Sequence, residues 1–347
     1  MNDNRNVNDR HNVSWRCKLK LKLAIIGCGI KSSQYITTWI NRDDIEIIAV
    51  ADPNEKALKQ VGDIATNANK NIPVQFTDWQ EMLATHKSEL NSVYICTPHA
   101  SHAEQAISAL NANLDVLLEK PMVTTLEEAE LLNEARIKSN KEVVIAYQGG
   151  LSPLVHQLRK DIESNKYGEL ASISASIWEN WADTYTGHWK QVPAISGGGF
   201  MFDTGAHMMN TMSMLCGQEF QKVAAFMSNK GKPVDVVTTV MGTLTDGTNF
   251  SMHACGKTIG CTSRIECFFS EHIVRICAWG RWVEIENAQG EVVRHEQESA
   301  NNLINIFQLT LTNRMENPSS VTQGIKMAKL WDSIKESAKQ DGQPVQC

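Results

Sequence analysis

Two closely spaced glycines, set between a strand pattern and a helical pattern, constrain the fold of this chain more than any other feature. Gly27 and Gly29 directly follow the aliphatic run at 21–26 and precede an amphipathic stretch at 33–40. Without Cβ atoms the backbone can turn tightly here and approach a pyrophosphate at the positive N-terminus of a helix. We therefore expect Gly27, Gly29 and Ile30 to contact a dinucleotide, although two glycines alone are a weak indication.

Asp52 makes the dinucleotide interpretation more specific. It follows the second aliphatic run, 45–51, and comes 25 residues after Gly27, where a carboxylate can accept hydrogen bonds from the adenosine ribose hydroxyls. Ser32 takes the place of a third glycine, and a residue this small still allows close packing of helix against strand. No arginine follows over 53–55 to meet a 2′-phosphate. The sequence favours NAD as the cofactor and leaves NADP open.

Aliphatic runs alternate with helical patterns over the first 150 residues. Continuous Val, Ile and Leu runs with helices between them indicate a parallel sheet that is covered on both faces. The sequence predicts a Rossmann domain, a doubly wound parallel α/β sheet, over 21–148. The expected strands are 21–26, 45–51, 73–76, 92–96, 115–118 and 142–147.

Strands dominate the second half of the chain. The alternating segments 236–244 and 249–255 are joined through Asp246 and Gly247, a dipeptide suited to a tight hairpin turn. Helical patterns near 303–313 and 321–339 close the chain. We expect an α+β domain over 149–342, with a large, open and mostly antiparallel sheet that binds substrate. The polar, Asn-rich start predicts a disordered N-terminal tail over 1–20.

Composition excludes several classes of protein. The 347 residues carry 33 Lys and Arg against 39 Asp and Glu, a net charge of −6, without the positive field that nucleic-acid binding needs. The nine cysteines include no C-x-x-C, and the four between 255 and 277 match no standard ligand spacing, so we expect no metal. No signal peptide and no run of ~20 apolar residues is visible. We expect no membrane contact, and a location in the reducing cytoplasm.

Three further blocks carry a family resemblance. They are Cys96-Thr-Pro-His-Ala-Ser-His102, Glu119-Lys-Pro121 and Gly197-Gly-Gly-Phe-Met-Phe-Asp203-Thr-Gly-Ala-His207. Over roughly 21–340 the sequence resembles the glucose-fructose oxidoreductase, inositol dehydrogenase and MocA family. The resemblance implies pyridine-nucleotide redox chemistry on a sugar, a cyclitol or a derivative. It also implies a homodimer or homotetramer formed through the open sheet.

The resemblance assigns cofactor roles to several residues. Thr97 and Pro98 are expected to shape the nicotinamide pocket. His102 is expected near the cofactor as a helix-start residue rather than a proton carrier. Glu119 is expected there as a strand-end carboxylate satisfied by backbone donors. A cis peptide bond before Pro121 is also implied, which would aim the preceding lysine.

Three polar residues are the candidate catalytic set. Asp203 and His207 lie at i and i+4 of a helical pattern, so both side chains project from one face. His207 is a suitable proton acceptor for a hydroxyl at neutral pH, and Asp203 would orient its ring or hold a neighbouring substrate hydroxyl. Lys120, at the end of the fifth strand, can stabilise a developing alkoxide. Trp189 and Lys190 precede the catalytic block and are expected to contact substrate together with these three.

Departures from the family pattern leave the substrate open. Gly149 and Gly150 stand where many members carry an arginine-containing segment, and Asn210 replaces a frequent aspartate one turn beyond His207. An alternative to a dehydrogenase is a redox-neutral glycosidase or lyase that uses transient oxidation without net NADH formation. A second alternative is a dinucleotide-sensing regulator without catalysis. The presence of Lys120 together with the Asp203 and His207 pair disfavours the regulator.

Overall fold

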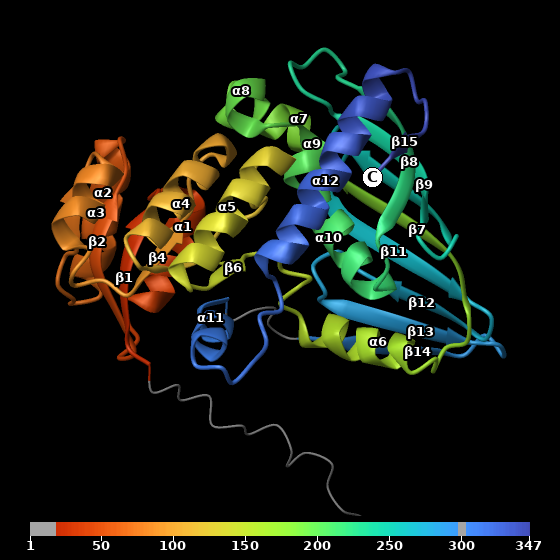
Figure 1. Cartoon of the computed structure of the whole chain (residues 1–347), viewed down its shortest axis with the longest axis horizontal. Helices are drawn as coiled ribbons and strands as arrows, with labels where there is room; N and C mark the ends of the chain where they lie inside the picture. Colours follow the sequence, from red (N-terminus) through yellow and green to blue (C-terminus); the bar gives the residue numbers. More distant parts are fainter. Residues whose placement is uncertain (1–18, 298–302) are drawn as a thin grey trace, which may run out of the picture.

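The computed structural model describes residues 19–297 and 303–347. The disordered tail expected over 1–20 therefore lies outside the described residues, apart from Leu19 and Lys20. Figure 1 shows two layered regions side by side: a helix-covered sheet formed by the first part of the chain, and a larger sheet formed by the second part. The final long helix, α12 (Val321–Lys339), lies between the two sheets.

The first sheet has six parallel strands in the order β3-β2-β1-β4-β5-β6. The strand segments are aliphatic, and all four residues of β4 are buried, as expected for a sheet with helices on both faces. This arrangement confirms the predicted Rossmann sheet. Its elements are β1 (Leu21–Ile26), α1 (Ile30–Trp39), β2 (Ile45–Ala51), α2 (Glu55–Asn67), β3 (Val74–Phe76), α3 (Trp79–His86), β4 (Ser92–Ile95), η2 (His99–Ser101), α4 (His102–Asn111), β5 (Asp115–Leu118), α5 (Leu126–Ser139) and β6 (Val143–Ile145).

The second sheet has nine strands in the order β14-β13-β12-β11-β7-β10-β9-β8-β15. Neighbouring strands are antiparallel except β7 and β10, so the predicted mostly antiparallel sheet is confirmed. Burial alternates along β10, because one face packs on helices and the other is open. The strands are β7 (Leu170–Glu179), β8 (Phe220–Ser228), β9 (Val237–Leu244), β10 (Asn249–Cys255), β11 (Cys261–Phe269), β12 (His272–Ile276), β13 (Trp282–Asn287), β14 (Val292–Glu296) and β15 (Val345–Gln346).

The helices of the second region gather on the side of the nine-stranded sheet that faces the first region (Figure 1). Several are single turns that lie in the connection between β7 and β8. The single turns are α7 (Trp181–Thr184), η3 (Trp189–Gln191), α8 (Pro193–Ser196) and α9 (Phe200–Asp203). The longer helices are α6 (Pro153–Glu163), which precedes β7, and α10 (Gly205–Cys216), which precedes β8.

Helix α11 (Leu303–Leu311) differs from its expected place. The sequence groups it with the second domain, but Leu303, Ile304 and Phe307 belong to the hydrophobic cluster around Leu21 and Leu23 of β1. The chain therefore returns to the first sheet before it forms α12. The hydrophobic effect explains this position, because the apolar face of the helix packs against the β1 region and both apolar surfaces are removed from water.

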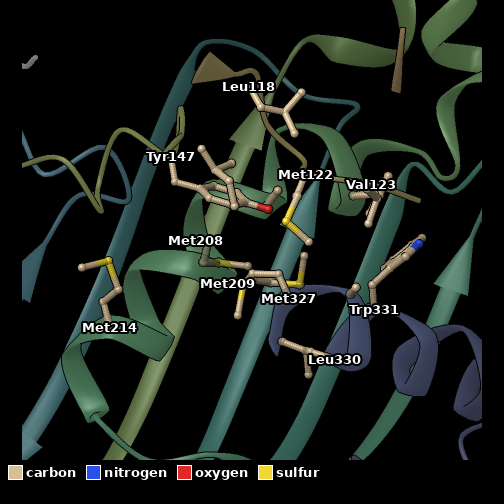
Figure 2. Close-up of a cluster of buried hydrophobic side chains, with 14 of the residues drawn as sticks. Leu118, Met122, Val123, Tyr147, Met208, Met209, Met214, Met327, Leu330 and Trp331 are labelled. Atoms are coloured by element: carbon tan, nitrogen blue, oxygen red, sulfur yellow. The ribbon is translucent and has the colours of Figure 1, made fainter. Parts of the chain in front are cut away.

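One hydrophobic core joins the two regions (Figure 2). It brings together Met122 and Val123, which come just after Lys120, with Met208 and Met209 of α10, and all four side chains are at most 2% exposed. Burying an apolar side chain of this size stabilises the fold by roughly 1.5–3 kcal/mol. The strand-end loop that carries Lys120 and the helix that carries His207 are thus fixed against each other.

Candidate active site

The loop after β1 has the geometry that a dinucleotide-binding turn needs. Gly27 has φ of +90°, and a Cβ there would lie 2.4 Å from the carbonyl oxygen of Cys96, so only glycine fits. Nothing lies within 4 Å of a Cβ built on Gly29, which leaves the first turn of α1 open to an approaching group. Ser32 is buried, and its hydroxyl donates to the carbonyl oxygens of Gly27 at 2.7 Å and Gly29 at 3.1 Å. Ile30 is exposed beside this loop.

Asp52 lies at the end of β2, directly beside the glycine loop. Its Oδ2 accepts a 2.8 Å hydrogen bond from the Cys28 amide, and its Oδ1 accepts one of 2.8 Å from the Asn54 amide. Each oxygen keeps further acceptor capacity, because a carboxylate oxygen has two lone pairs. The donors hold the carboxylate next to the open turn, so the residues present fit the diphosphate and ribose of a dinucleotide.

Thr97, Pro98 and His102 form the next loop along the same sheet edge. The Thr97 hydroxyl donates to Gln105 at 2.6 Å, and Pro98 begins the short helix η2. The His102 side chain is completely buried, with its ring nitrogens 2.8 Å from the Pro121 carbonyl oxygen and 3.0 Å from that of Thr97. His102 therefore joins the loop after β4 to the loop after β5.

Glu119 is buried at the end of β5. Its Oε1 accepts a 2.9 Å hydrogen bond from the Tyr94 hydroxyl, and its Oε2 accepts one of 3.3 Å from the Lys120 amide. The next peptide bond, Lys120–Pro121, is cis. One side-chain donor and one backbone donor thus hold the carboxylate that precedes Lys120.

Asp203 is the centre of the candidate site. Lys120 Nζ donates to its Oδ1 and to its backbone oxygen, both at 2.9 Å. Lys190 Nζ donates to its Oδ2 at 2.7 Å, and the indole nitrogen of Trp181 donates to the same oxygen at 2.8 Å. The carboxylate is 2% exposed. Two ammonium groups and one neutral donor therefore surround one buried negative charge.

This surrounding fixes the protonation state of Asp203. Burial alone would raise the pKa of its carboxyl, but the adjacent ammonium groups of Lys120 and Lys190 lower the pKa well below its usual value of 3.8. Asp203 is therefore ionised at neutral pH. The same attraction affects Lys190. Burial alone would lower the pKa of its ammonium, but the negative charge of Asp203 raises that pKa above its usual value.

His207 is placed near this cluster but is not bonded to its carboxylate. The spacing of four residues suggested that Asp203 orients the His207 ring; instead, no hydrogen bond joins the two side chains in the described structure, because Asp203 is engaged by the lysines. Nδ1 of His207 is buried without a hydrogen-bond partner. Burial lowers the pKa of His207 well below 6.5, and the Lys120 ammonium lowers it further. The imidazole is therefore neutral and can accept a proton.

A buried aspartate, Asp235, fixes the start of the segment that leads to Asp203. A Cβ on Gly199 would lie 1.9 Å from the carbonyl oxygen of Asp235, so the glycine allows this close approach. The Asp235 side chain accepts hydrogen bonds from the Gly199 amide at 2.7 Å and the Met201 amide at 3.1 Å. These bonds satisfy amide groups at the beginning of α9, the short helix that ends at Asp203.

Trp189 and His99 complete the surroundings of Asp203. The Trp189 ring lies 4.8 Å from the His99 ring, edge to face. Nδ1 of His99 lies 2.8 Å from the Ser196 carbonyl oxygen, and its Nε2 lies 3.9 Å from Oδ1 of Asp203. Burial lowers the pKa of His99 to about 3. His99 thus brings a neutral ring from the first region against the second.

Sequence reasoning missed four of these residues. His99 lies inside the recognised Cys96–His102 block, so the block itself was the signal for it. Trp181 stood in an aromatic segment where core packing and a site role were equally favoured. Asp235 and Trp279, whose ring centroid lies 6.0 Å from that of His207, carried no local signal because their contacts are distant in sequence.

Two negative observations bear on other ligands. Within 19–297 and 303–347, no group of three or more His, Cys, Asp or Glu side chains is arranged to hold a metal ion. None of the helices described there has the length and apolar composition that a membrane crossing requires.

Family models match both halves of the chain. Residues 21–147 match the oxidoreductase family with an NAD-binding Rossmann fold, and residues 155–275 match the GFO/IDH/MocA C-terminal domain. The chain belongs to the GFO/IDH/MocA oxidoreductase family, as the sequence resemblance indicated.

Curated relatives of the chain include named dehydrogenases. Oxidoreductase P35 of Formosa agariphila is 30% identical over 207 residues, covering 57% of this chain and 61% of the relative. D-glucoside 3-dehydrogenase of Escherichia coli is 26% identical over 198 residues, covering 57% of this chain and 54% of the relative. The chain thus spans about half to three fifths of the length of such relatives.

Solved structures show the same fold over nearly the whole chain. An inositol dehydrogenase homologue from Azotobacter vinelandii, complexed with NAD⁺, has a TM-score of 0.82 at 16% identity, covering 96% of this chain and 98% of that one. Levoglucosan dehydrogenase in complex with NADH has a TM-score of 0.80 at 19% identity, covering 94% of this chain and 98% of that one. At these identities the likeness establishes the fold.

Proposed function

We propose that this protein is an NAD(P)-dependent oxidoreductase that interconverts a secondary alcohol and a ketone on a sugar, a cyclitol or a sugar derivative. The convergence of Lys120 from the first region with Asp203 from the second, close to His207, carries this proposal. Named relatives act on ring alcohols, among them D-glucoside 3-dehydrogenase, levoglucosan dehydrogenase and a scyllo-inositol 2-dehydrogenase.

The cofactor would bind along the carboxyl edge of the first sheet. Gly27, Gly29 and Ile30 form the open turn for the diphosphate, and Asp52 is positioned for the ribose hydroxyls. Thr97, with Pro98, is placed on the adjacent loop, where the predicted nicotinamide pocket would lie. We propose NAD, because Asp52 is a carboxylate and would repel a 2′-phosphate. Bound NAD would supply the hydride acceptor.

His207 accepts the hydroxyl proton in the proposed oxidation. Its neutral imidazole is ready for this role at neutral pH, and a positioned base of this kind contributes roughly 10²–10⁴-fold to rate. Lys120 stabilises negative charge that develops on the substrate oxygen, because its ammonium is preoriented by two oxygens of Asp203. Asp203 holds that ammonium in place.

The predicted substrate residues Trp189 and Lys190 take different parts in this scheme. Lys190 is bonded to Asp203 and lies over the Tyr185 ring, with Nζ 4.3 Å from the ring centroid. It therefore fixes the second oxygen of the carboxylate. Trp189 is half-buried against His99 and offers the remainder of its ring to a sugar face, which is apolar along its C–H bonds.

A substrate panel tests the proposal. Sugars and cyclitols are incubated with the protein and either NAD or NADP, while NADH absorbance and product are measured together. The proposal expects reduced cofactor to accumulate in a one-to-one ratio with ketone. Product without net reduced cofactor would instead support the redox-neutral glycosidase or lyase, and nucleotide binding without any product would support a regulator.

We also propose that two copies associate through the open face of the nine-stranded sheet. Phe226 of β8 is 54% exposed and Met241 of β9 is 57% exposed, and these exposed side chains are large and apolar. Light scattering after chromatography tests this: the wild type should run as a dimer or tetramer, and Met241→Glu should shift it toward monomer. A monomeric wild type would contradict the proposal.

The cytoplasm is the compartment that we propose. Cys28 and Cys267 are buried, and burial raises the pKa of both thiols to about 12. They act as small apolar core residues, which suits a reducing compartment. Fractionation of producing cells would locate the protein directly.

A further inference from the structure

The turn between β12 and β13 enters the candidate site. The Ala278 carbonyl oxygen accepts a 2.6 Å hydrogen bond from the Thr211 hydroxyl on α10, and the Gly280 carbonyl oxygen accepts one of 2.7 Å from Ser152. Both bonds are buried. The first bond fastens the turn to α10, the helix that carries His207, and the second fastens it to Ser152 at the start of α6. The residue between the two carbonyls, Trp279, is therefore held beside His207.

Trp279 links the catalytic histidine to an arginine. Its ring centroid lies 6.0 Å from that of His207, and Cζ of Arg281 lies 5.7 Å from the same Trp279 centroid. A cation held near an indole in this way gains a favourable interaction with the ring. Trp279 thus contacts both His207 and Arg281.

Arg281 lacks the carboxylate partners that its neighbours have. In the same sheet, Arg275 pairs with Glu266 at 3.0 Å and with Glu286 at 2.6 Å. Arg294 pairs with two glutamates, each at 2.6 Å. No carboxylate in the described part of the chain forms an ion pair with Arg281, and the side chain is exposed. Its guanidinium is therefore available to an anion from outside the chain.

The electrostatic setting favours such an anion. Lys120 and Lys31 are among the cations that act on the buried His207 ring. The negative charge of Asp203 is already taken up by Lys120 and Lys190. The next carboxylate, Glu179, accepts a 3.0 Å hydrogen bond from the Thr204 hydroxyl. The surroundings of His207 are thus positive on balance.

We propose that Arg281, held by Trp279, binds an anionic group of the substrate, and that the substrate is a ring polyol carrying a carboxylate or a phosphate. This inference rests on the proposed function, because it names the substrate class of the same site. A guanidinium matches both oxyanions, since it offers paired N–H donors in a plane.

Three compounds that share the same sugar ring test the inference: D-glucose, D-glucuronate and D-glucose 6-phosphate. Their binding to the NADH-loaded protein is measured by calorimetry, beside kcat/KM with NAD. At least one of the two anions should bind tenfold or more tightly than glucose. Tighter binding of glucuronate would identify a carboxylate as the preferred group, and tighter binding of glucose 6-phosphate would identify a phosphate. Arg281→Gln should reduce that preference at least tenfold, and Arg281→Lys should retain part of it.

Arg294→Gln is the matched control, because Arg294 also lies over a tryptophan but is paired with glutamates. It should leave the preference unchanged. Equal binding of all three sugars, or an equal loss for all three in Arg281→Gln, would overturn the inference. If an anion binds preferentially but no reduced cofactor forms, the result would contradict the proposed function and support this inference.

Discussion

Lys120 and Asp203 lie 83 residues apart in the chain, yet the ammonium of the first donates 2.9 Å hydrogen bonds to both Oδ1 and the backbone oxygen of the second. Both partners come from segments that pack into one core, so the contact is built by the fold and not by a local motif. An ion pair this buried is costly to break, by about 3–5 kcal/mol when one partner is removed.

Trp181→Phe should distinguish two contributions of Trp181: the hydrogen bond that orients Asp203 and the packing of the aromatic ring. The substitution keeps most of the ring but removes the N–H that donates to Oδ2 of Asp203 at 2.8 Å. Loss of a donor to a buried charged group costs roughly 1.5–3 kcal/mol, so we expect kcat to fall about tenfold or more. Steady-state kinetics measure this, with Trp282→Phe on β13 as the control. Unchanged kcat would show that Lys120 and Lys190 orient the carboxylate without help.

His207→Asn should lower kcat by ~10² or more, because the variant has no proton acceptor. NAD affinity should stay close to that of the wild type, since the cofactor residues are unchanged. His253→Asn, on the exposed side of β10, is the control. A variant with full turnover would remove His207 from the role of base.

Asp52→Asn should weaken NAD binding by roughly tenfold, because a neutral amide replaces the charged acceptor of the ribose hydroxyls. Titration followed by tryptophan fluorescence measures the affinity. Asp63→Asn, an exposed change on α2, should leave it unaltered. If both variants bind NAD like the wild type, the ribose contact lies elsewhere.

Acid should destabilise the protein below pH 6.5. Burial lowers the pKa of His99 to about 3 and that of His207 well below 6.5, while both titrate near ~6.5 in the unfolded chain. Below that pH the unfolded state binds protons that the folded state does not. Stability is therefore complete above pH 6.5 and falls by about 1.4 kcal/mol per pH unit for each histidine.

Urea unfolding at pH 7 and pH 5.5 measures this loss. His99→Asn should flatten the pH dependence, because it removes one of the two groups. A midpoint that stays constant between these pH values in the wild type would show that neither histidine is held neutral by the fold.

The fold class could be predicted from the sequence because the pattern of apolar residues indicates which strands and helix faces are buried. The continuous aliphatic stretches at β1 and β2 gave the strands to the residue, and the hairpin at Gly247 joined β9 to β10 as expected. Helix α11 was harder, since an apolar helix face does not say which sheet it covers. Its place depends on packing against Leu21, almost 300 residues away in sequence.

Motifs in the sequence supplied the candidate site residues, but not the contacts that those residues make. Motifs suggested Lys120, Asp203 and His207 as the candidate set, and in the structure the Asp203 carboxylate lies close enough to act on the His207 ring. Helical periodicity does not determine which side chains bond to each other. Asp203 pairs with Lys120 and Lys190 because attraction between opposite charges is stronger than a hydrogen bond to a neutral imidazole. The Asp235 carboxylate reaches Met201 from 34 positions further along the chain, so no local pattern could reveal it.

Turnover of Lys120→Met tests the central claim most directly. Methionine is one atom shorter than lysine, so it keeps most of the side chain and removes its charge. NAD binding measured in parallel shows whether the first region is intact. The account predicts that reduced cofactor and ketone formation fall together by about 10²–10³-fold, with NAD still bound. A Lys120→Met protein that oxidises its ring alcohol at the wild-type rate would contradict it.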